Sequence, residues 1–269
     1  MVGKKVLLHL ALFLATAPIP GWAQSWGTNP GLNALADNMV KSLNEFMHRF
    51  NADEVPPFIV DDSSGNLRRK CVISLFDLHQ VPEGESALGD RIMRFVDSVL
   101  ENNIRLDITT PGIYAEARSL FKHKGKSLEI NLVMVYDNYR DDYWRWTLAG
   151  ANGLVESGLV DTSRSGYISP TNHAVGFTEL GKAFPKTTRY WSPAHSVDQL
   201  SYISALSECG SLQFDGCQEI VYYFTQVPGY VFSVTMHPRQ DINTGWLIHD
   251  LVELPNEQKR SFITQLLGK

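Results

Sequence analysis

The clearest hydrophobic pattern lies near the start of the chain, over residues 29–50. Asn29 followed by Pro30 is a favourable helix start, because Asn caps free backbone N–H groups and Pro fits the first turn. Apolar residues then recur at intervals of three and four, opposite a charged face. The pattern predicts an amphipathic helix that packs on another layer. Its apolar stripe consists of Leu32, Leu35, Ala36, Met39, Val40, Leu43, Phe46, Met47 and Phe50.

A second helical pattern covers residues 90–100. Before it, residues 61–69 are polar and predict a turn, and residues 71–76 form a short apolar element. The helical pattern has a continuous apolar side, which is expected to face the core. That side holds Ile92, Met93, Phe95, Val96, Val99 and Leu100.

The period then changes to the alternation that is typical of strands. Ile104, Leu106 and Ile108 alternate with polar neighbours, and a turn around Gly125 separates two longer segments. Aromatic residues, which favour strands, mark the last segment. The expected strands cover residues 114–121, 127–136 and 142–149.

The second half of the chain repeats this order. Residues 150–171 are rich in Gly, Ser, Thr and Asn, which indicates a linker or surface connection. Residues 174–184 form a weak helical pattern, and Ser196 with Gln199 makes a capping box for another helix. Asn256 can cap a closing helix. The strands expected between the last two helices cover residues 218–224, 230–237 and 245–254.

Both halves therefore run from helices into an antiparallel meander that ends in a tryptophan-bearing strand. This shared order predicts an α+β fold with a curved antiparallel sheet packed against an amphipathic helix, built as two tandem cone-like units. The predicted units cover residues 24–154 and 174–269, with a linker at 155–173. The alternative is one continuous α+β domain.

The first 23 residues have the order of a secretory signal peptide. Lys4 and Lys5 precede an apolar run over residues 6–16, and small residues follow as far as Ala23. The run is shorter than the roughly 20 residues that a bilayer-spanning helix needs. We therefore expect cleavage after Ala23, export to the periplasm or the medium, and no stable membrane insertion.

The charge balance and the cysteines limit the partners and the cross-links. Without the signal peptide the chain has 22 basic residues against 29 acidic ones, which argues against nucleic acid as a partner. Cys209 and Cys217 bracket a short loop-like stretch and could form a disulfide, or they could lie on separate elements. Cys71 lies in an apolar stretch and is expected to be a buried small hydrophobic residue.

An amphipathic first helix, a short helix and a long twisted meander together resemble the cone-shaped nuclear transport factor 2-like fold, which is related to the cystatins. The resemblance covers residues 29–154 and, less well, 174–269. It implies a mostly apolar pocket at the open end of the cone, with a few placed polar groups. This superfamily includes enzymes, binding proteins and assembly modules, so the fold does not settle the function.

The resemblance directs attention to polar and aromatic residues of the first meander. On one interpretation these side chains line a ligand cavity. On the other, the charged ones face solvent and the tryptophans belong to the core. The candidate ligand-contacting residues are Tyr114, Glu116, Arg118, Trp144, Arg145 and Trp146.

No catalytic or cofactor motif stands out, and no metal or cofactor is expected from the spacing of the histidines. Asp77 with His79, and His249 with Asp250, are interpreted as structural pairs. The histidines beyond the signal peptide are scattered at His48, His79, His123, His173, His195, His237 and His249.

These observations predict an exported, non-catalytic binding or assembly module that recognises a small ligand or an envelope protein. The alternative is a hydrolase or isomerase-like enzyme of the same fold, with an acid and a histidine in the cone pocket, for example Glu116 with His79. A homodimer formed through strand edges or exposed tryptophans is a further alternative.

Overall fold

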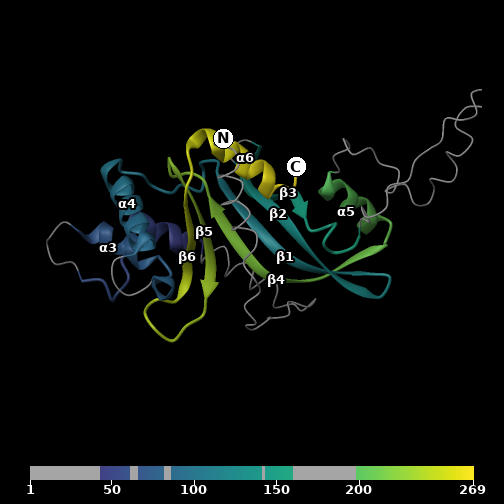
Figure 1. Ribbon diagram of the computed structural model, residues 1–269, viewed down its shortest axis with the longest axis horizontal. Helices are drawn as coiled ribbons and strands as arrows, with labels where there is room; N and C mark the ends of the chain where they lie inside the picture. Colours follow the sequence, from purple (N-terminus) through teal and green to yellow (C-terminus); the bar gives the residue numbers. More distant parts are fainter. Residues whose placement is uncertain (1–42, 61–65, 82–85, 141–142, 160–197) are drawn as a thin grey trace, which may run out of the picture.

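The computed structural model describes residues 43–60, 66–81, 86–140, 143–159 and 198–269 (Figure 1). Its centre is one open six-stranded sheet in the order β3-β2-β1-β4-β5-β6, with every neighbouring pair antiparallel. The α+β class with a curved sheet against helices is confirmed. The strands are β1 (Ile113–His123), β2 (Lys126–Arg140), β3 (Tyr143–Asn152), β4 (Leu212–Phe224), β5 (Tyr230–His237) and β6 (Gly245–Glu253).

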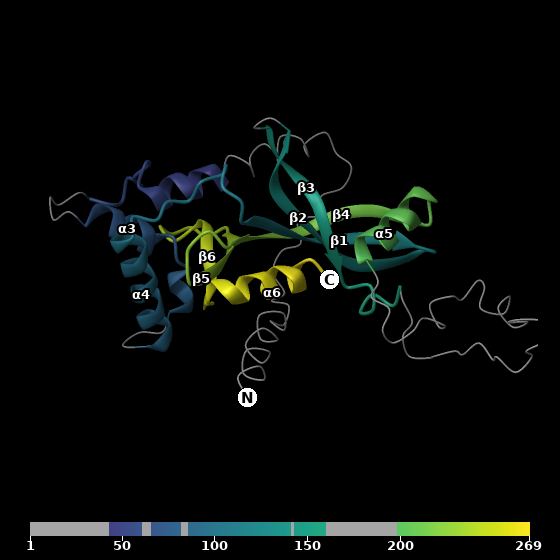
Figure 2. The same ribbon diagram turned by 90° about the horizontal axis from the view of Figure 1, so that it is seen from above.

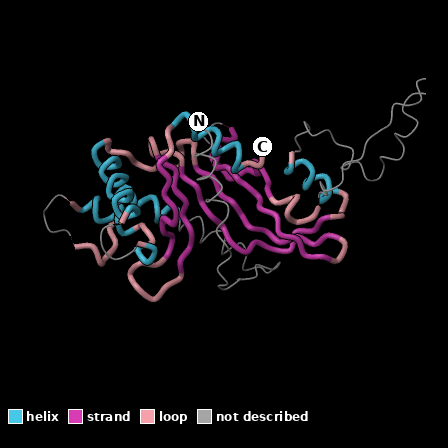
Figure 3. Tube along the Cα trace, viewed as in Figure 1, coloured by secondary structure: helices cyan, strands magenta, loops and turns pink. Residues whose placement is uncertain are grey.

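The helices lie at the two ends of the sheet and on both of its faces, with residues 43–51 on one face and α6 on the other (Figure 2). Helices α3 and α4 lie beside β5 and β6, whereas α5 lies at the far end, where β1, β2 and β4 extend (Figures 1 and 3). Among the described helices, none has both the length and the apolar character required to cross a bilayer. The described helices are residues 43–51, α3 (Leu67–Ser74), the 3-10 turn η1 (Leu78–Gln80), α4 (Ala87–Glu101), α5 (Gln199–Glu208) and α6 (Asn256–Leu266).

The two predicted meanders are both present, and they are joined edge to edge in a single sheet. Strands β1 and β4 pair over their whole length, with Tyr114 opposite Tyr223 and Ala117 opposite Ile220. The meanders are therefore not separate sheets. The reason is that β1 is the outer strand of the first meander and β4 is the outer strand of the second. Each has unpaired backbone groups along one edge, and the two edges pair with each other.

The β1–β2 turn shows why the sequence marks this hairpin so clearly. Lys124 and Gly125 have φ values of 51° and 77°. A two-residue turn with both φ angles positive matches the twist of the strands that it joins. By contrast, the alternating residues 104–108 form no strand, and the structure leaves them as a loop before β1.

The first helix packs on the sheet as predicted, over the part that the structure describes. The ring centroids of Phe46 and Phe224 lie 5.5 Å apart, and those of Phe50 and Phe232 lie 6.2 Å apart. Phe224 and Phe232 belong to β4 and β5. This half of the stripe thus lies across a β layer, whereas the stripe residues from Leu32 to Val40 fall outside the described residues.

Helix α4 completes this core with the predicted apolar side, except at one position. Phe95 has no exposed surface and makes edge-to-face contacts with Phe50, Phe76 and Phe232. Met93, expected on the buried side, is 42% exposed. The helix contacts its neighbours over a narrower stripe than the apolar pattern suggests.

The apolar element at 71–76 is mainly helix rather than a separate strand. Residues 67–74 form α3, and Cys71 is buried in it as expected. Only Phe76 has β character, through a parallel bridge to Ile248 of β6. Asp77 and His79 therefore do not share a strand face.

The N-cap positions of α5 and α6 differ from the predicted ones, and are Asp198 and Pro255. Asp198 caps α5 by accepting a hydrogen bond from the backbone N–H of Ser201, whereas Ser196 lies outside the described residues. Asn256 is the first residue of α6, and its side chain accepts a hydrogen bond from the N–H of Gly229 at 3.1 Å. Asn256 thus ties the helix to the β4–β5 turn.

The expected linker begins within the sheet. Gly150, Ala151 and Asn152 are the last residues of β3, and the backbone of Leu267 packs closely against Gly150. Asn152 also donates a hydrogen bond from Nδ2 to the carbonyl of Leu266 at 2.6 Å. Residues 160–197, which include the predicted helix at 174–184, are outside the described residues.

The disulfide between Cys209 and Cys217 is not formed. All three cysteines are free, with Cys209 exposed after α5 and Cys217 inside β4. The thiol of Cys209 donates to Ser211 Oγ, and that of Cys217 donates to the carbonyl of Glu219. Because β4 begins at Leu212, the stretch between the two cysteines is largely strand rather than a closed loop.

Candidate functional site

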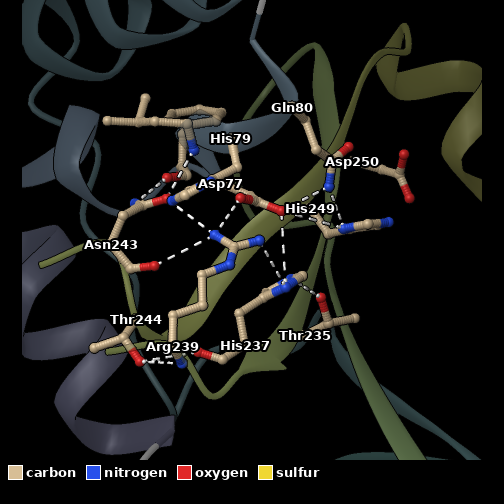
Figure 4. A network of polar contacts seen from close by, with 12 residues as sticks. Asp77, His79, Gln80, Thr235, His237, Arg239, Asn243, Thr244, His249 and Asp250 are labelled. Carbon is tan, nitrogen blue, oxygen red and sulfur yellow. Dashed lines mark hydrogen bonds and ion pairs between the residues drawn. The ribbon is translucent and has the colours of Figure 1, made fainter. Parts of the chain in front are cut away.

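A cluster of polar side chains lies where the helical layer meets the edge strand β6 (Figure 4). After α3, the backbone N–H of Asp77 donates to the carbonyl of Ile248 at 2.9 Å. The parallel bridge between Phe76 and Ile248 sets this register and places Asp77 next to His249. We call the cluster the Asp77 network. It consists of Asp77, Gln80, Thr235, His237, Arg239, Asn243 and His249.

Asn243, from the β5–β6 loop, fastens this loop to the segment that carries Asp77. Its Nδ2 donates to the carbonyl of Phe76 at 2.8 Å, and its Oδ1 accepts from the N–H of Leu78 at 3.0 Å. Asn243 is buried, so its paired amide fixes the loop as a strand neighbour would. Two distant parts of the chain thereby share one rigid contact.

The carboxylate of Asp77 is 2% exposed and is held by two donors. Arg239 Nη1 lies 2.6 Å from Oδ1, and Gln80 Nε2 donates to Oδ2 at 2.8 Å. Burial alone would raise the pKa of this carboxyl group. The hydrogen bonds from Arg239 and Gln80, with the nearby charges of His237 and Arg239, overcome that effect and lower the pKa to about 2.

Two histidines turn their Nδ1 atoms toward this carboxylate. His237 Nδ1 lies 3.7 Å from Asp77 Oδ2, and His249 Nδ1 lies 3.9 Å from the same oxygen. The two rings stack at 5.4 Å between centroids, and their side chains are 18% and 28% exposed. Burial lowers the pKa of His237, with Arg239 and His249 adding to it against the attraction of Asp77.

The donors around each ring fix its tautomer. A guanidinium can only donate, and Arg239 Nη2 lies 3.3 Å from His237 Nδ1, so this nitrogen is an acceptor. In the neutral ring Nε2 then carries the hydrogen, and it lies 2.7 Å from Thr235 Oγ1. The amide nitrogen of Gln80 lies 2.5 Å from His249 Nδ1, which makes that atom an acceptor too.

A β-bulge sets the direction of His249. In the β5–β6 ladder Val234 pairs with Ile248 and Ser233 pairs with Asp250, so His249 has no partner on β5. An extra residue of this kind bends the strand and redirects its side chain. The bulge turns His249 toward Asp77, although Ile248 next to it points into the core.

The six candidate ligand residues do not converge on one cavity, because β-strand side chains alternate between faces. Tyr114 packs with Tyr223 and Phe262 on the face covered by α6. Trp146 packs with Tyr222 on the opposite face, at 5.8 Å between centroids. Trp144 stacks on Tyr136, which also contacts Trp146. The tryptophans therefore belong to an aromatic row on the face of the first helix.

The charged candidates on β1 are engaged within the sheet. Glu116 is buried and accepts hydrogen bonds from Tyr223 Oη and Asn131 Nδ2, each at 3.0 Å. Arg118 is partly exposed and forms ion pairs with Glu219 at 3.0 Å and Glu129 at 3.5 Å. Glu116 and Arg118 do border a common hollow of about 30 Å³. A cavity needs roughly 10–15 Å³ of such space to hold one water molecule, so this hollow has room for about two.

Arg145 is exposed on β3 and lies opposite Asp137 in the ladder. The register puts Arg145 on the same face of the sheet as Tyr114. Tyr114 lies opposite Val135, Val135 lies opposite Thr147, and Arg145 is two residues before Thr147 on β3. The acid and histidine that the sequence pairs for catalysis are also apart. His79 Nε2 lies 3.0 Å from Asp241, and Glu116 is held by residues of the sheet.

Sequence reasoning missed the Asp77 network because its members come from three distant segments. Asp77 and Arg239 are 162 positions apart in the chain. The sequence carried one signal of this site: His237 ends one predicted strand, and His249 lies within the next predicted strand. Only the bulge and the bridge to Phe76 bring these rings to Asp77.

No family model, curated protein or solved structure matches this chain. The chemistry of the described residues therefore carries the functional conclusion. Among these, the Asp77 network is the place where a buried carboxylate and two histidines turn their acceptor atoms toward one another.

Proposed function

We propose that the protein is an exported, non-catalytic binding module that holds a cationic or hydrogen-bond-donating group at the Asp77 network. That group belongs either to a small ligand or to an envelope protein. One observation carries the proposal: Asp77 Oδ2, His237 Nδ1 and His249 Nδ1 converge at a partly exposed rim. Three acceptors that face one another repel unless a donor or a cation lies between them.

The donor now in this position is replaceable. Gln80 lies on the short turn η1, is exposed, and bridges Asp77 Oδ2 and His249 Nδ1 with its amide nitrogen. An exposed glutamine side chain can rotate into solvent at a modest cost in hydrogen bonds, which water replaces. A ligand that offers a stronger donor or a positive charge can then take its place.

The same geometry argues against the enzyme alternative. A general base must present a nitrogen toward its substrate. Both ring nitrogens of His237 already have partners in Arg239 and Thr235. Asp77 does not orient His249 directly either, because the amide nitrogen of Gln80 lies between them. This nitrogen is 2.8 Å from Asp77 Oδ2 and 2.5 Å from His249 Nδ1.

Export and the nuclear transport factor 2-like relationship remain part of the proposal. The basic, apolar and small-residue order of residues 1–23 supports export. The packing of Phe46 and Phe50 on the sheet supports the fold relationship. Mass spectrometry of the protein recovered from its natural compartment tests cleavage after Ala23, and an intact residue 1 would contradict it.

Nuclear magnetic resonance of the histidine side chains tests the binding site itself. We expect methylammonium, guanidinium or divalent metal ions to shift the ring signals of His237 and His249 in a saturable manner. The ring signal of His79, which pairs with Asp241 on the exposed rim, serves as the internal control and should stay in place. If none of these cations shifts the two rings more than that of His79, the proposed site is wrong.

A further inference from the structure

We propose that the ligand of the Asp77 network is a divalent transition-metal ion of the zinc type, bound by Asp77 Oδ2, His237 Nδ1 and His249 Nδ1. This inference rests on the proposed function and names its ligand class. Imidazole nitrogens and one carboxylate oxygen form a donor set that suits zinc and similar ions. A fourth position stays open to water or to a donor from a partner.

The distances are close to those of a bound site. Both histidine Nδ1 atoms lie within 4 Å of Asp77 Oδ2, and all three atoms are within 4.8 Å of one another. In a tetrahedral zinc site with bonds of 2.0–2.1 Å, neighbouring ligand atoms are about 3.4 Å apart. The two Nδ1 atoms must each move only about 0.5 Å closer to Asp77 Oδ2 to reach this spacing.

The surroundings already orient the ligands. Metal-bound histidines commonly donate their second ring N–H to a nearby acceptor, and bound carboxylates are themselves hydrogen-bonded. Thr235 Oγ1 lies 2.7 Å from His237 Nε2, and Arg239 holds the second oxygen of Asp77 at 2.6 Å. Asp77 and the two rings are thus held close together before an ion arrives, and His237 Nδ1 has to give up its contact with Arg239 Nη2 to bind it.

Gln80 competes with the ion. Its amide nitrogen contacts two of the three ligand atoms, so the metal must displace it. Arg239 also opposes binding, because its guanidinium lies 3.3 Å from His237 Nδ1 and repels a second cation. We therefore expect reversible binding that strengthens when the Gln80 side chain is removed.

Titration of the purified, chelator-treated protein with Zn²⁺, measured by calorimetry, tests this inference. A parallel titration with Co²⁺ reports the coordination of the ion through its visible absorption. We expect one bound ion per chain, and a visible Co²⁺ spectrum that is typical of four-coordinate rather than six-coordinate cobalt. His237→Gln and His249→Gln should each lower the affinity at least about tenfold, and Thr235→Val by about tenfold through the loss of ligand orientation. Gln80→Ala should raise the affinity severalfold.

His79→Gln is the matched control, because His79 is an exposed histidine on the same rim that contacts Asp241 instead. It should leave Zn²⁺ affinity unchanged, and circular dichroism should show that every variant is folded. Equal Zn²⁺ binding by the wild type, His237→Gln and His249→Gln would overturn the inference, as would the absence of a saturable site. If organic cations shift the His237 and His249 rings while Zn²⁺ does not bind, the metal assignment fails and the proposed binding site stands.

Discussion

Two buried carboxyl groups, Asp77 and Glu116, are held by different kinds of hydrogen-bond donor. Asp77 relies on a guanidinium and an amide at the edge of the sheet. Glu116 lies within the sheet and relies on the neutral donors of Tyr223 and Asn131. Removing a donor from a buried charge costs more than a neutral hydrogen bond is worth, so both sites give measurable predictions.

We expect Asp77→Asn to lower the free energy of unfolding by about 2 kcal/mol at pH 7, since the carboxyl pKa falls from 3.8 to about 2 and each unit is worth about 1.4 kcal/mol. Because the folded pKa is the lower one, this contribution is present above pH 4. It disappears as the pH falls toward 2. Urea unfolding of both proteins across this range measures it, and parallel pH profiles would contradict it.

Tyr223→Phe should lower the free energy of unfolding by about 1–3 kcal/mol, because the buried side chain of Glu116 then loses one of its two donors. Burial and the neighbouring Glu116 raise the pKa of Tyr223 well above its usual value, so the hydroxyl remains a donor throughout the neutral range. Tyr222→Phe is the matched control on the opposite face. Its effect in urea unfolding should be smaller, and equal effects would show that Glu116 does not depend on Tyr223.

At the scale of elements, helix α4 packs on the core through a narrow apolar stripe. Helix α4 buries Ile92, Phe95, Val96 and Val99 and leaves the apolar Met93 outside. The periodic pattern predicts such a helix well, since the positions that face a layer recur every three or four residues. The pattern does not show how wide the facing layer is.

Phe95→Ala should cost about 3–5 kcal/mol of unfolding free energy, because this ring is fully buried and contacts three other phenylalanine rings. Met93→Ala, two residues away on the same helix, should change it by less than about 0.5 kcal/mol. Thermal or urea unfolding measures both. Similar losses for the two variants would mean that Met93 is covered in solution.

For the whole molecule, the β1–β4 pairing makes the two meanders one structural body. We expect a single unfolding transition, because neither meander can lose its strands without exposing the edge of the other. Tryptophan fluorescence and far-ultraviolet circular dichroism should give the same midpoint. Two separate transitions would instead support independent units at 24–154 and 174–269.

The sequence alone determined the local elements whose patterns are strong. Strand β5 covers the predicted residues 230–237, and the hairpin around Gly125 forms as expected, since alternation and turn chemistry are local properties. Caps were less predictable: Asp198 caps α5, and α6 begins after Pro255 without a side-chain cap because Asn256 accepts from Gly229 instead.

Only the tertiary structure decided which residues form the site. The sequence placed Glu116 and Trp146 on the first and third strands of one meander, but the alternation of side chains and the strand register put them on opposite faces. Asp77 and His249, 172 positions apart in the chain, meet through the Phe76 bridge and a bulge in β6. Local patterns follow from the energies of neighbouring residues, whereas this contact depends on how separate elements pack, which no short window of sequence contains.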